Sequence, residues 1–282
     1  MTKLYRILIL GNVFILTSCF SQNKTDKDRE IFNCYLDVIK EIDNDSLFIK
    51  TACFFLNTPY DYSTLDVNEY EELVVNLQKM DCMTFVENCI ALYRVASVDT
   101  PNFELFKKEL QYIRYRDGII AGYLSRLHYT TDWIFDNVKK NVFYDKSKEI
   151  GGMSFLTDVY FMSKNPQFYD YLKKRPDEIQ SIKKIEDSIN MRKDFYYYIP
   201  KGDIISKEKQ IKTGDILCFT TSIEGLDVSH LGIAFWKDNI LTFIHASSDY
   251  RKVIINTKTL SDFCMNNRNI TGVIVLKANT LS

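Results

Sequence analysis

Proline, glycine and histidine are scarce in this sequence, with five prolines, ten glycines and three histidines among 282 residues. So few turn-forming residues, with no repeat or low-complexity block, exclude a repeat or linker-rich architecture. The formal net charge is only −1, and acidic and basic residues are mixed along the chain. The concentrated basic face that binds nucleic acid is therefore missing. Hydrophobic residues make up 46% of the chain and aromatic residues 14%, which is enough for a sizeable core.

Closely spaced cysteine pairs of the C-x-x-C type are missing as well. The chain has seven cysteines, and none of them forms a C-x-x-C pair. Most lie in apolar runs such as 52–55 and 217–219, where cysteine usually behaves as a small buried hydrophobe. Cys82 stands in a different setting, directly after Asp81.

The first residues have the pattern of an export signal. Lys3 and Arg6 precede an almost wholly apolar run, Ile7 to Leu16, which is too short to span a bilayer about 30 Å thick. The segment that follows, Leu16 to Cys19, resembles the lipobox of bacterial lipoproteins. This resemblance implies that residues 1–18 are a lipoprotein signal peptide and that Cys19 is lipidated. An ordinary signal peptide with an incidental cysteine is the alternative.

The predicted lipid gives the chain a location and a domain order. We expect it to be exported and anchored to a bacterial membrane, facing the periplasm or cell wall. Residues 19–30 are polar and nearly free of apolar side chains, so we predict a flexible tether there. By length the remaining residues, 31–282, fit one large domain or two small ones, and we predict a single domain.

The order of the elements predicts an α+β fold. Apolar spacing and capping signals predict helices over 31–42, 47–56, 82–96, 103–116, 131–140 and 176–193. β-rich runs separated by turn signals lie at 216–219, 231–236, 241–244, 253–255 and 272–276. Helices first and an antiparallel sheet afterwards are typical of α+β rather than α/β proteins.

Cys82 has the surroundings of a nucleophile. Asp81 can cap a helix that starts at Cys82, and Thr84 with Glu87 offers an alternative capping box. The N-terminus of a helix lowers a thiol pKa through its dipole and its free N–H groups. The same N–H groups point at any oxyanion that forms on an attacked carbonyl. Alone, a cysteine at a helix start is more often structural.

Two of the three histidines provide a base and its partner. His230 opens one predicted strand and His245 closes the next. A hairpin turn at Lys237–Asp238 would place the imidazoles directly opposite each other on one face, and a turn at Asp238–Asn239 would place them diagonally on one face. A three-residue loop without a compensating bulge would put them on opposite faces. A general base needs such a partner to fix its tautomer. Either histidine taken singly would be interpreted as structural.

These motifs together resemble a known superfamily. The order of Asp81–Val86, Val228–Ala234 and Phe243–Ser247 is similar to that of the NlpC/P60 cysteine peptidases and amidases, which cleave peptidoglycan on a papain-like fold. The resemblance implies a catalytic triad of Cys82, His230 and His245. In this family a helical N-terminal half carries the nucleophile and packs on a C-terminal antiparallel sheet.

Longer segments narrow the resemblance. Residues 73–87, 126–134 and 225–230 are similar to the DUF1460 branch, whose members are N-acetylmuramoyl-L-alanine amidase-like. This implies hydrolysis of the N-acetylmuramoyl-L-alanine amide bond in muropeptides through a Cys82 thioester. Met83 and Thr84 replace the Ser-Gly that often follows the nucleophile in the superfamily. That departure disfavours a γ-D-glutamyl endopeptidase, which stays the alternative.

Further polar and aromatic residues are candidates for contacting substrate. Those near position 130 form a mixed basic and aromatic segment, with Trp133 as a possible stacking platform. The others flank the two histidines. The candidates are Arg126, His128, Tyr129, Trp133, Asp227, Ser247 and Ser248. Packing of the first segment at a helix edge explains it equally well.

Two functions of other classes remain open. One is a non-catalytic cell-wall-binding lipoprotein on a hydrolase fold. The other is a zinc amidase that uses His128, His230 and His245, although the chain has no H-E-x-x-H pattern. We expect muropeptides and the membrane as partners, and no metal or organic cofactor.

Overall fold

The computed structural model describes residues 24–62, 64–192 and 195–281. The predicted signal peptide and Cys19 lie outside these ranges. The longer helices are α1 (Lys24–Ile39), α2 (Asn44–Phe54), α3 (Cys82–Ala96), α4 (Phe103–Arg114), α5 (Thr130–Lys139) and α8 (Ile179–Asn190). The shorter ones are α6 (Phe161–Lys164), α7 (Asp170–Lys174), α9 (Ile204–Lys207) and α10 (Leu260–Asn266). No helix within the described ranges is long and apolar enough to cross a membrane.

The strands form a single antiparallel sheet. They are β1 (Phe143–Asp145), β2 (Met153–Ser154), β3 (Tyr197–Pro200), β4 (Ile216–Thr221), β5 (Val228–Lys237), β6 (Ile240–Ser247), β7 (Lys252–Ile255) and β8 (Ile270–Ala278). Their order is β2-β3-β8-β4-β5-β6-β7, and β1 also pairs with β8. The predicted α+β class is confirmed, with a helical N-terminal half and an antiparallel sheet.

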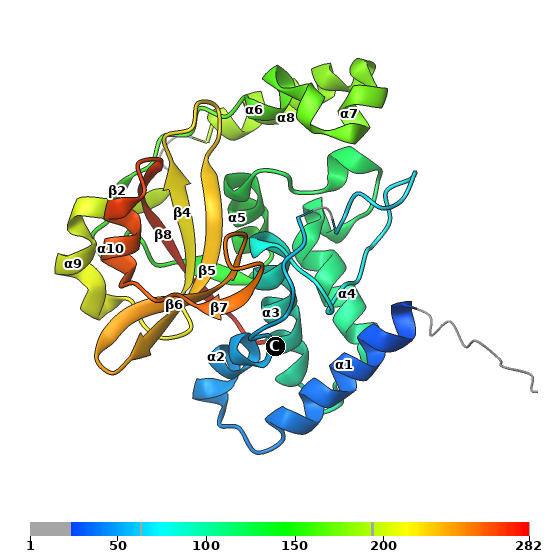
Figure 1. Cartoon of the computed structure of the whole chain (residues 1–282). Coiled ribbons are helices and arrows are strands. Elements are labelled where there is room, and N and C mark those ends of the chain that lie inside the picture. Colours follow the sequence, from blue (N-terminus) through cyan, green and yellow to red (C-terminus); the bar gives the residue numbers. More distant parts are fainter. Residues whose placement is uncertain (1–23, 63, 193–194, 282) are drawn as a thin grey trace, which may run out of the picture.

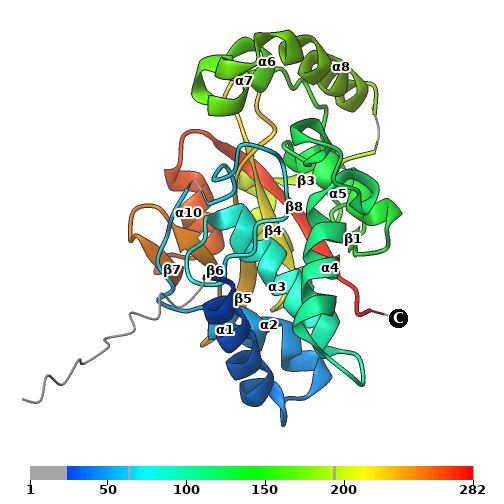
Figure 2. The ribbon, with the colours of Figure 1, turned by 90° about the vertical axis from the view of Figure 1, so that its right-hand side faces the viewer.

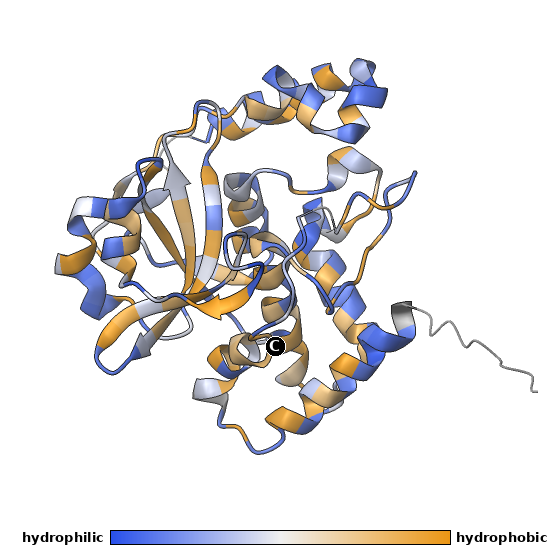
Figure 3. Ribbon diagram, viewed as in Figure 1, coloured by the Kyte–Doolittle hydropathy of each residue, from blue (hydrophilic) through white to orange (hydrophobic). Residues whose placement is uncertain are grey.

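Helices cover both faces of the sheet. Along β4, Cys218 faces the helices α1 to α4, whereas Leu217 and Phe219 belong to a second core beneath α9 and α10. Figures 1 and 2 show these layers, with α6, α7 and α8 standing beyond one end of the sheet. Those three helices contribute to a small third core of their own. The strands and α3 are largely hydrophobic in Figure 3, whereas α1 alternates along its length.

Helix α3 is the central helix, and its polar side chains are buried too. The sequence pattern places Glu87, Asn88 and Arg94 outside the apolar stripe, yet all three are buried. Glu87 accepts from the Arg114 guanidinium at 2.7 Å, and Arg94 donates to Glu109 at 2.8 Å. These polar groups can be buried because partners from other elements pair with them.

The first helix starts earlier than the sequence indicates. Residues 24–30 lie in α1, although the pattern predicts a flexible tether through Glu30. Asp28 is buried, and its carboxylate accepts the Leu77 N–H at 2.9 Å. A tertiary contact thus makes a polar segment part of the fold, and the domain begins before Ile31.

The hairpin that carries the two histidines has the second of the two predicted registers. Lys237 pairs with Ile240, so Asp238 and Asn239 form the turn. Both turn residues have positive φ, 50° and 63°, as a type I′ turn requires. This register places His230 and His245 diagonally on one face.

Candidate active site

Cys82 is the first residue of α3, and a reciprocal cap fixes the start of this helix. The Asp81 carboxylate accepts the Thr84 N–H at 2.8 Å, and the Thr84 hydroxyl accepts the Asp81 N–H at 2.9 Å. Asp81 is therefore the N-cap, and the alternative box with Glu87 does not form. Cys82 is half-buried, and the backbone N–H groups of Cys82 and Met83 face its sulfur.

The sulfur lies beside the strand that carries His230. Strand β5 pairs with β6 only from Ile233 onward, so its first residues are not hydrogen-bonded to β6. The N–H of Leu231 faces the Cys82 sulfur at this opening. Because Leu231 follows His230 directly, this contact brings the start of α3 next to the strand segment that carries His230.

The two imidazoles form a close pair. His230 Nε2 and His245 Nδ1 are 2.7 Å apart, and the rings are nearly perpendicular, at 86°. Phe219 and Phe263 flank the His230 ring, while Phe243 and Phe263 flank the His245 ring. This aromatic surround leaves each ring little freedom to rotate.

Burial disfavours the charged forms of the Cys82 thiol and of both imidazoles. Burial, followed by the Asp81 carboxylate, raises the pKa of Cys82 to about 12, and the three N–H groups that lower it do not compensate. Burial lowers the pKa of His230 to about 3, with a contribution from His245, and that of His245 to about 4. The pKa of the Cys82 thiol is thus raised, whereas its place at a helix start predicted a lowered pKa. Removal of the proton must accompany attack, which requires a neutral base.

The contact between the two histidines can fix the tautomer in which His230 acts as a neutral base. If His230 Nε2–H donates to His245 Nδ1, the other ring nitrogen of His230 keeps its lone pair. His245 then carries its proton on Nε2, which is buried without a partner among the described residues. Both histidines border a polar cavity of about 310 Å³. Its polar lining includes Ser229, Ser247, Ser248, Asp249, Asn267 and Asn269.

Tyr60 is a site residue that the sequence interpretation missed. Its pKa is raised to about 12 by burial and by the charges of Cys82 and Asp81, which places the phenol beside the nucleophile. A β-bridge to Met80 and a hydrogen bond from Tyr60 N to Arg251 O hold its backbone. The sequence offered only Pro59-Tyr60 as a helix breaker, and no local signal connects that turn with Cys82.

The other predicted substrate contacts are not all brought to the site. Trp133 is fully buried against Phe143, at 4.7 Å between ring centroids, and leaves no ring face for a ligand. Tyr129 is also buried, where it donates to Glu186 at 2.7 Å. The Asp227 carboxylate accepts the Thr131 N–H at 2.7 Å, so it caps α5 instead of orienting a histidine.

Three of the four remaining candidates border one of two cavities. Ser247 and Ser248 border the cavity behind the histidine pair. Arg126 lines a second, larger cavity, and His128 binds the Tyr123 carbonyl from its Nε2 at 2.8 Å. Within the described ranges, no group of three or more His, Cys, Asp or Glu side chains is arranged to hold a metal ion.

Comparison with known proteins gives a consistent result. The model of the AmiA-like family, described as N-acetylmuramoyl-L-alanine amidase-like, matches residues 50–273. An N-acetylmuramoyl-L-alanine amidase from Bacteroides uniformis is 36% identical over 84% of this chain and 99% of its own, with a TM-score of 0.80. No curated protein matches the chain.

Two further solved structures share the fold. A Bacteroides fragilis protein with a provisional xylanase name is 35% identical over 81% of this chain and 99% of its own, with a TM-score of 0.76. A Legionella pneumophila protein of the DUF1460 family is 19% identical over 90% of this chain and 95% of its own, with a TM-score of 0.68. At that identity the Legionella protein supports the fold alone.

Proposed function

Because the chain belongs to the AmiA-like, N-acetylmuramoyl-L-alanine amidase-like family, we propose that it hydrolyses the N-acetylmuramoyl-L-alanine amide bond of muropeptides with Cys82 as nucleophile. The observation that carries this proposal is the His230–His245 contact of 2.7 Å next to a strand N–H that faces the Cys82 sulfur. A helix-capped thiol beside a paired imidazole is also the arrangement expected of a papain-like NlpC/P60 enzyme.

The first half of the reaction forms a thioester. The Cys82 sulfur attacks the lactyl carbonyl carbon, and its proton passes to the His230 nitrogen that does not face His245. The N–H groups of Cys82 and Met83, with the Tyr60 hydroxyl nearby, stabilise the oxyanion. The carbon–nitrogen bond then breaks, and His230 returns the proton to the departing L-alanyl amine.

The second half releases the sugar acid. A water molecule attacks the thioester carbonyl while His230 takes its proton, and the carbon–sulfur bond breaks. The proton then returns to the Cys82 sulfur. His245 does not exchange protons with the substrate: it holds His230 in the reactive tautomer throughout. We also propose that the chain is exported and lipidated at Cys19, so that it meets muropeptides at a membrane surface.

A digest of purified muropeptides tests the proposal. The expected products are an intact stem peptide that begins with L-alanine and a peptide-free sugar. A shortened stem peptide would identify a γ-D-glutamyl endopeptidase instead. Equal turnover by the Cys82→Ala variant would exclude covalent catalysis by this thiol. Activity that disappears with a chelator but persists after thiol alkylation would identify a metal amidase.

The same assay distinguishes two other functions from the proposed amidase activity. A cell-wall-binding protein without catalysis would bind muropeptides and leave them intact. A glycosidase would cut between sugars and needs a pair of carboxyl groups across the bond, whereas the site around Cys82 offers a thiol and two imidazoles. Xylan incubated with the protein is therefore expected to remain uncut.

A further inference from the structure

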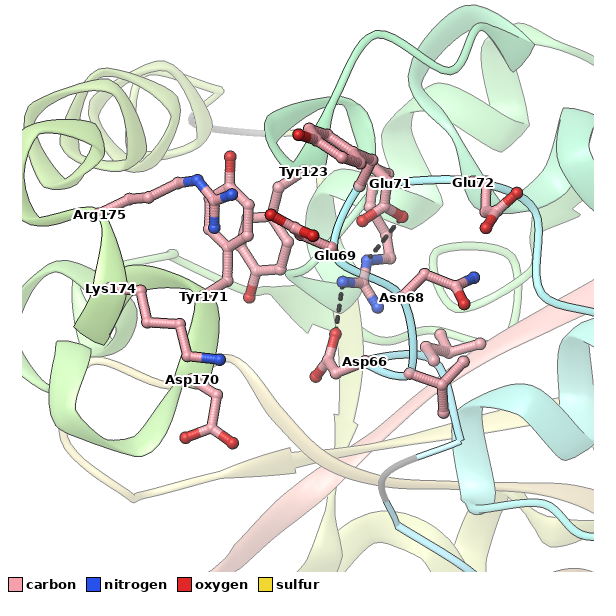
Figure 4. A pocket seen from close by; sticks show the side chains of 14 residues that line it. Asp66, Asn68, Glu69, Glu71, Glu72, Tyr123, Asp170, Tyr171, Lys174 and Arg175 are labelled. Carbon is pink, nitrogen blue, oxygen red and sulfur yellow. Dashed lines mark hydrogen bonds and ion pairs between the residues drawn. The ribbon is translucent and has the colours of Figure 1, made fainter.

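The larger cavity lies away from the thiol and has charged walls. Its volume is about 640 Å³. One wall is the loop segment 65–72, and the other consists of Asp170, Tyr171, Lys174 and Arg175 at helix α7. Figure 4 shows the two walls facing each other, with Lys174 and Glu69 projecting from opposite sides.

The tyrosines between the walls are not free to stack on a sugar. Tyr123 and Tyr171 are stacked at 4.0 Å with an angle of 8° between their planes. The Arg175 guanidinium lies over Tyr171 at 4.4 Å, and Arg126 lies over Tyr123 at 4.9 Å. Each ring therefore already has an aromatic neighbour and a cation. Binding a sugar ring by stacking would require breaking this column.

Arg126 is engaged by the loop and is not available to a ligand. It is buried, and its guanidinium is 2.6 Å from Asp66 and 3.3 Å from Glu71. Glu71 also accepts the Tyr115 hydroxyl at 2.8 Å. These contacts fix the loop wall, so the cavity is preformed and its shape does not depend on a ligand.

Charged side chains of both signs remain without an ion pair among the described residues, Lys174 and Arg175 on the helix wall and Glu69 and Glu72 on the loop wall. In the described part of the chain, no hydrogen bond or ion pair engages the Lys174 ammonium or the Glu69 carboxylate. Asp170 is 3.8 Å from Lys173 and is partly compensated. The cavity therefore presents unpaired cations on the helix wall and unpaired anions on the loop wall, which together match a ligand with both a carboxylate and an ammonium.

We propose that this cavity binds the zwitterionic end of a short peptide, with its carboxylate at Lys174 and its ammonium at Glu69. The inference rests on the proposed function, since the stem peptide of a muropeptide carries such groups when it contains a diamino acid. The chain limits the distance that such a peptide must span. Asp66 follows Tyr60 by six residues, which limits their separation to about 20 Å, and an extended tetrapeptide spans about 13 Å.

Binding of isolated fragments tests this inference without turnover. The Cys82→Ala protein is titrated by calorimetry with a free L-Ala-γ-D-Glu-diaminopimelate tripeptide, with the same peptide acetylated on its side-chain amine, and with the peptide-free disaccharide. We expect the tripeptide to bind. Acetylation of its side-chain amine and the Lys174→Ala substitution are each expected to lower the affinity about threefold to tenfold. Glu69→Gln is expected to weaken the tripeptide and to leave its acetylated form unchanged.

A lysine outside the cavity provides the matched control. Lys183→Ala removes the same charge from helix α8, at a residue that does not line the cavity and has no ion pair among the described residues, and it is expected to leave tripeptide affinity unchanged. Equal affinity of the Lys174→Ala and parent proteins, no tripeptide binding, or disaccharide binding that depends on Lys174 would each overturn the inference. Its failure is distinguishable from failure of the amidase proposal, because the muropeptide digest uses the wild-type protein and reads bond cleavage.

Discussion

The two cavities of this protein differ in what surrounds them. The cavity behind the histidine pair is bordered by neutral hydroxyls, amides and imidazoles together with Asp249, and its histidines lie on two strands of the central sheet. The cavity at α7 is bordered by charged side chains on a loop and a short helix. This contrast indicates that bond cleavage depends on the rigid sheet and recognition on inserted elements. Substitutions in the first region should therefore lower kcat, and those in the second should raise KM.

The largest effect is expected at the thiol. Cys82→Ser is expected to lower kcat by about 10⁴-fold or more, since a serine hydroxyl is a far weaker nucleophile with the same base. Cys34→Ser, which replaces an exposed free cysteine, serves as the control and should retain full activity. Steady-state release of L-alanyl peptide measures both. Comparable rates for the two variants would place the chemistry elsewhere.

The two histidines should separate into a base and its partner. His230→Gln removes the proton acceptor and is expected to lower kcat by about 10³-fold. His245→Asn keeps a polar partner for His230, and the expected loss is smaller, about 10-fold to 100-fold. Circular dichroism should show both variants folded. A larger loss for His245→Asn than for His230→Gln would reverse the assigned roles.

The acid limb of the pH profile of kcat/KM tests whether His230 and His245 are buried. The base acts in its neutral form, and burial lowers the pKa of His230 from 6.5 to about 3 and that of His245 to about 4. The rings therefore stay neutral as the pH falls through 6.5, and kcat/KM should decline only below about pH 4. The measurement is kcat/KM in overlapping buffers, on protein shown to be folded at each pH. A midpoint near pH 6.5 would mean that the base is solvated.

Tyr60 gives an intermediate effect. Tyr60→Phe keeps the ring between Cys82 and Arg251 and removes only the hydroxyl, so it tests the oxyanion contact without a cavity. We expect kcat to fall about 10-fold with KM within a factor of two. Tyr62→Phe, at an exposed tyrosine of the same segment, is the matched control. A change in KM alone would make Tyr60 a binding residue.

The smallest effect belongs to the charged cavity. Lys174→Ala should raise KM for a muropeptide with a diamino acid about threefold to tenfold and leave kcat unchanged, because the lost contact is equal in the ground and transition states. The increase should shrink at high salt. A fall in kcat with constant KM would contradict the division between the two regions.

Local signals explain which parts of the site were predictable from the sequence. The cap near Cys82 and the hairpin turn near Asp238 depend on a few consecutive residues. The sequence therefore narrowed the start of α3 and the register of the hairpin to a few choices each, and the structure selects Asp81 as the cap and Asp238 and Asn239 as the turn. The α+β order followed from the change in periodicity along the chain. These features need no knowledge of distant contacts.

The remaining features depend on contacts between distant residues. Glu87 is buried because Arg114 meets it from α4, and α1 reaches back to Lys24 because Asp28 finds the Leu77 N–H. Tyr60 lies beside Cys82 only through pairing with Met80 and Arg251. The raised pKa of the Cys82 thiol likewise results from burial that the helix-start pattern did not reveal. No one-residue signal encodes these long-range contacts.

Trapping the acyl-enzyme tests the central claim most directly. Wild-type protein is mixed with muropeptide, quenched in acid within milliseconds, and analysed by intact mass and peptide mapping. The account predicts an adduct with the mass of the peptide-free muramoyl acyl group, located on Cys82 and missing from Cys82→Ala. An adduct that retains stem-peptide residues, an adduct on another residue, or turnover without any adduct on the thiol would contradict it.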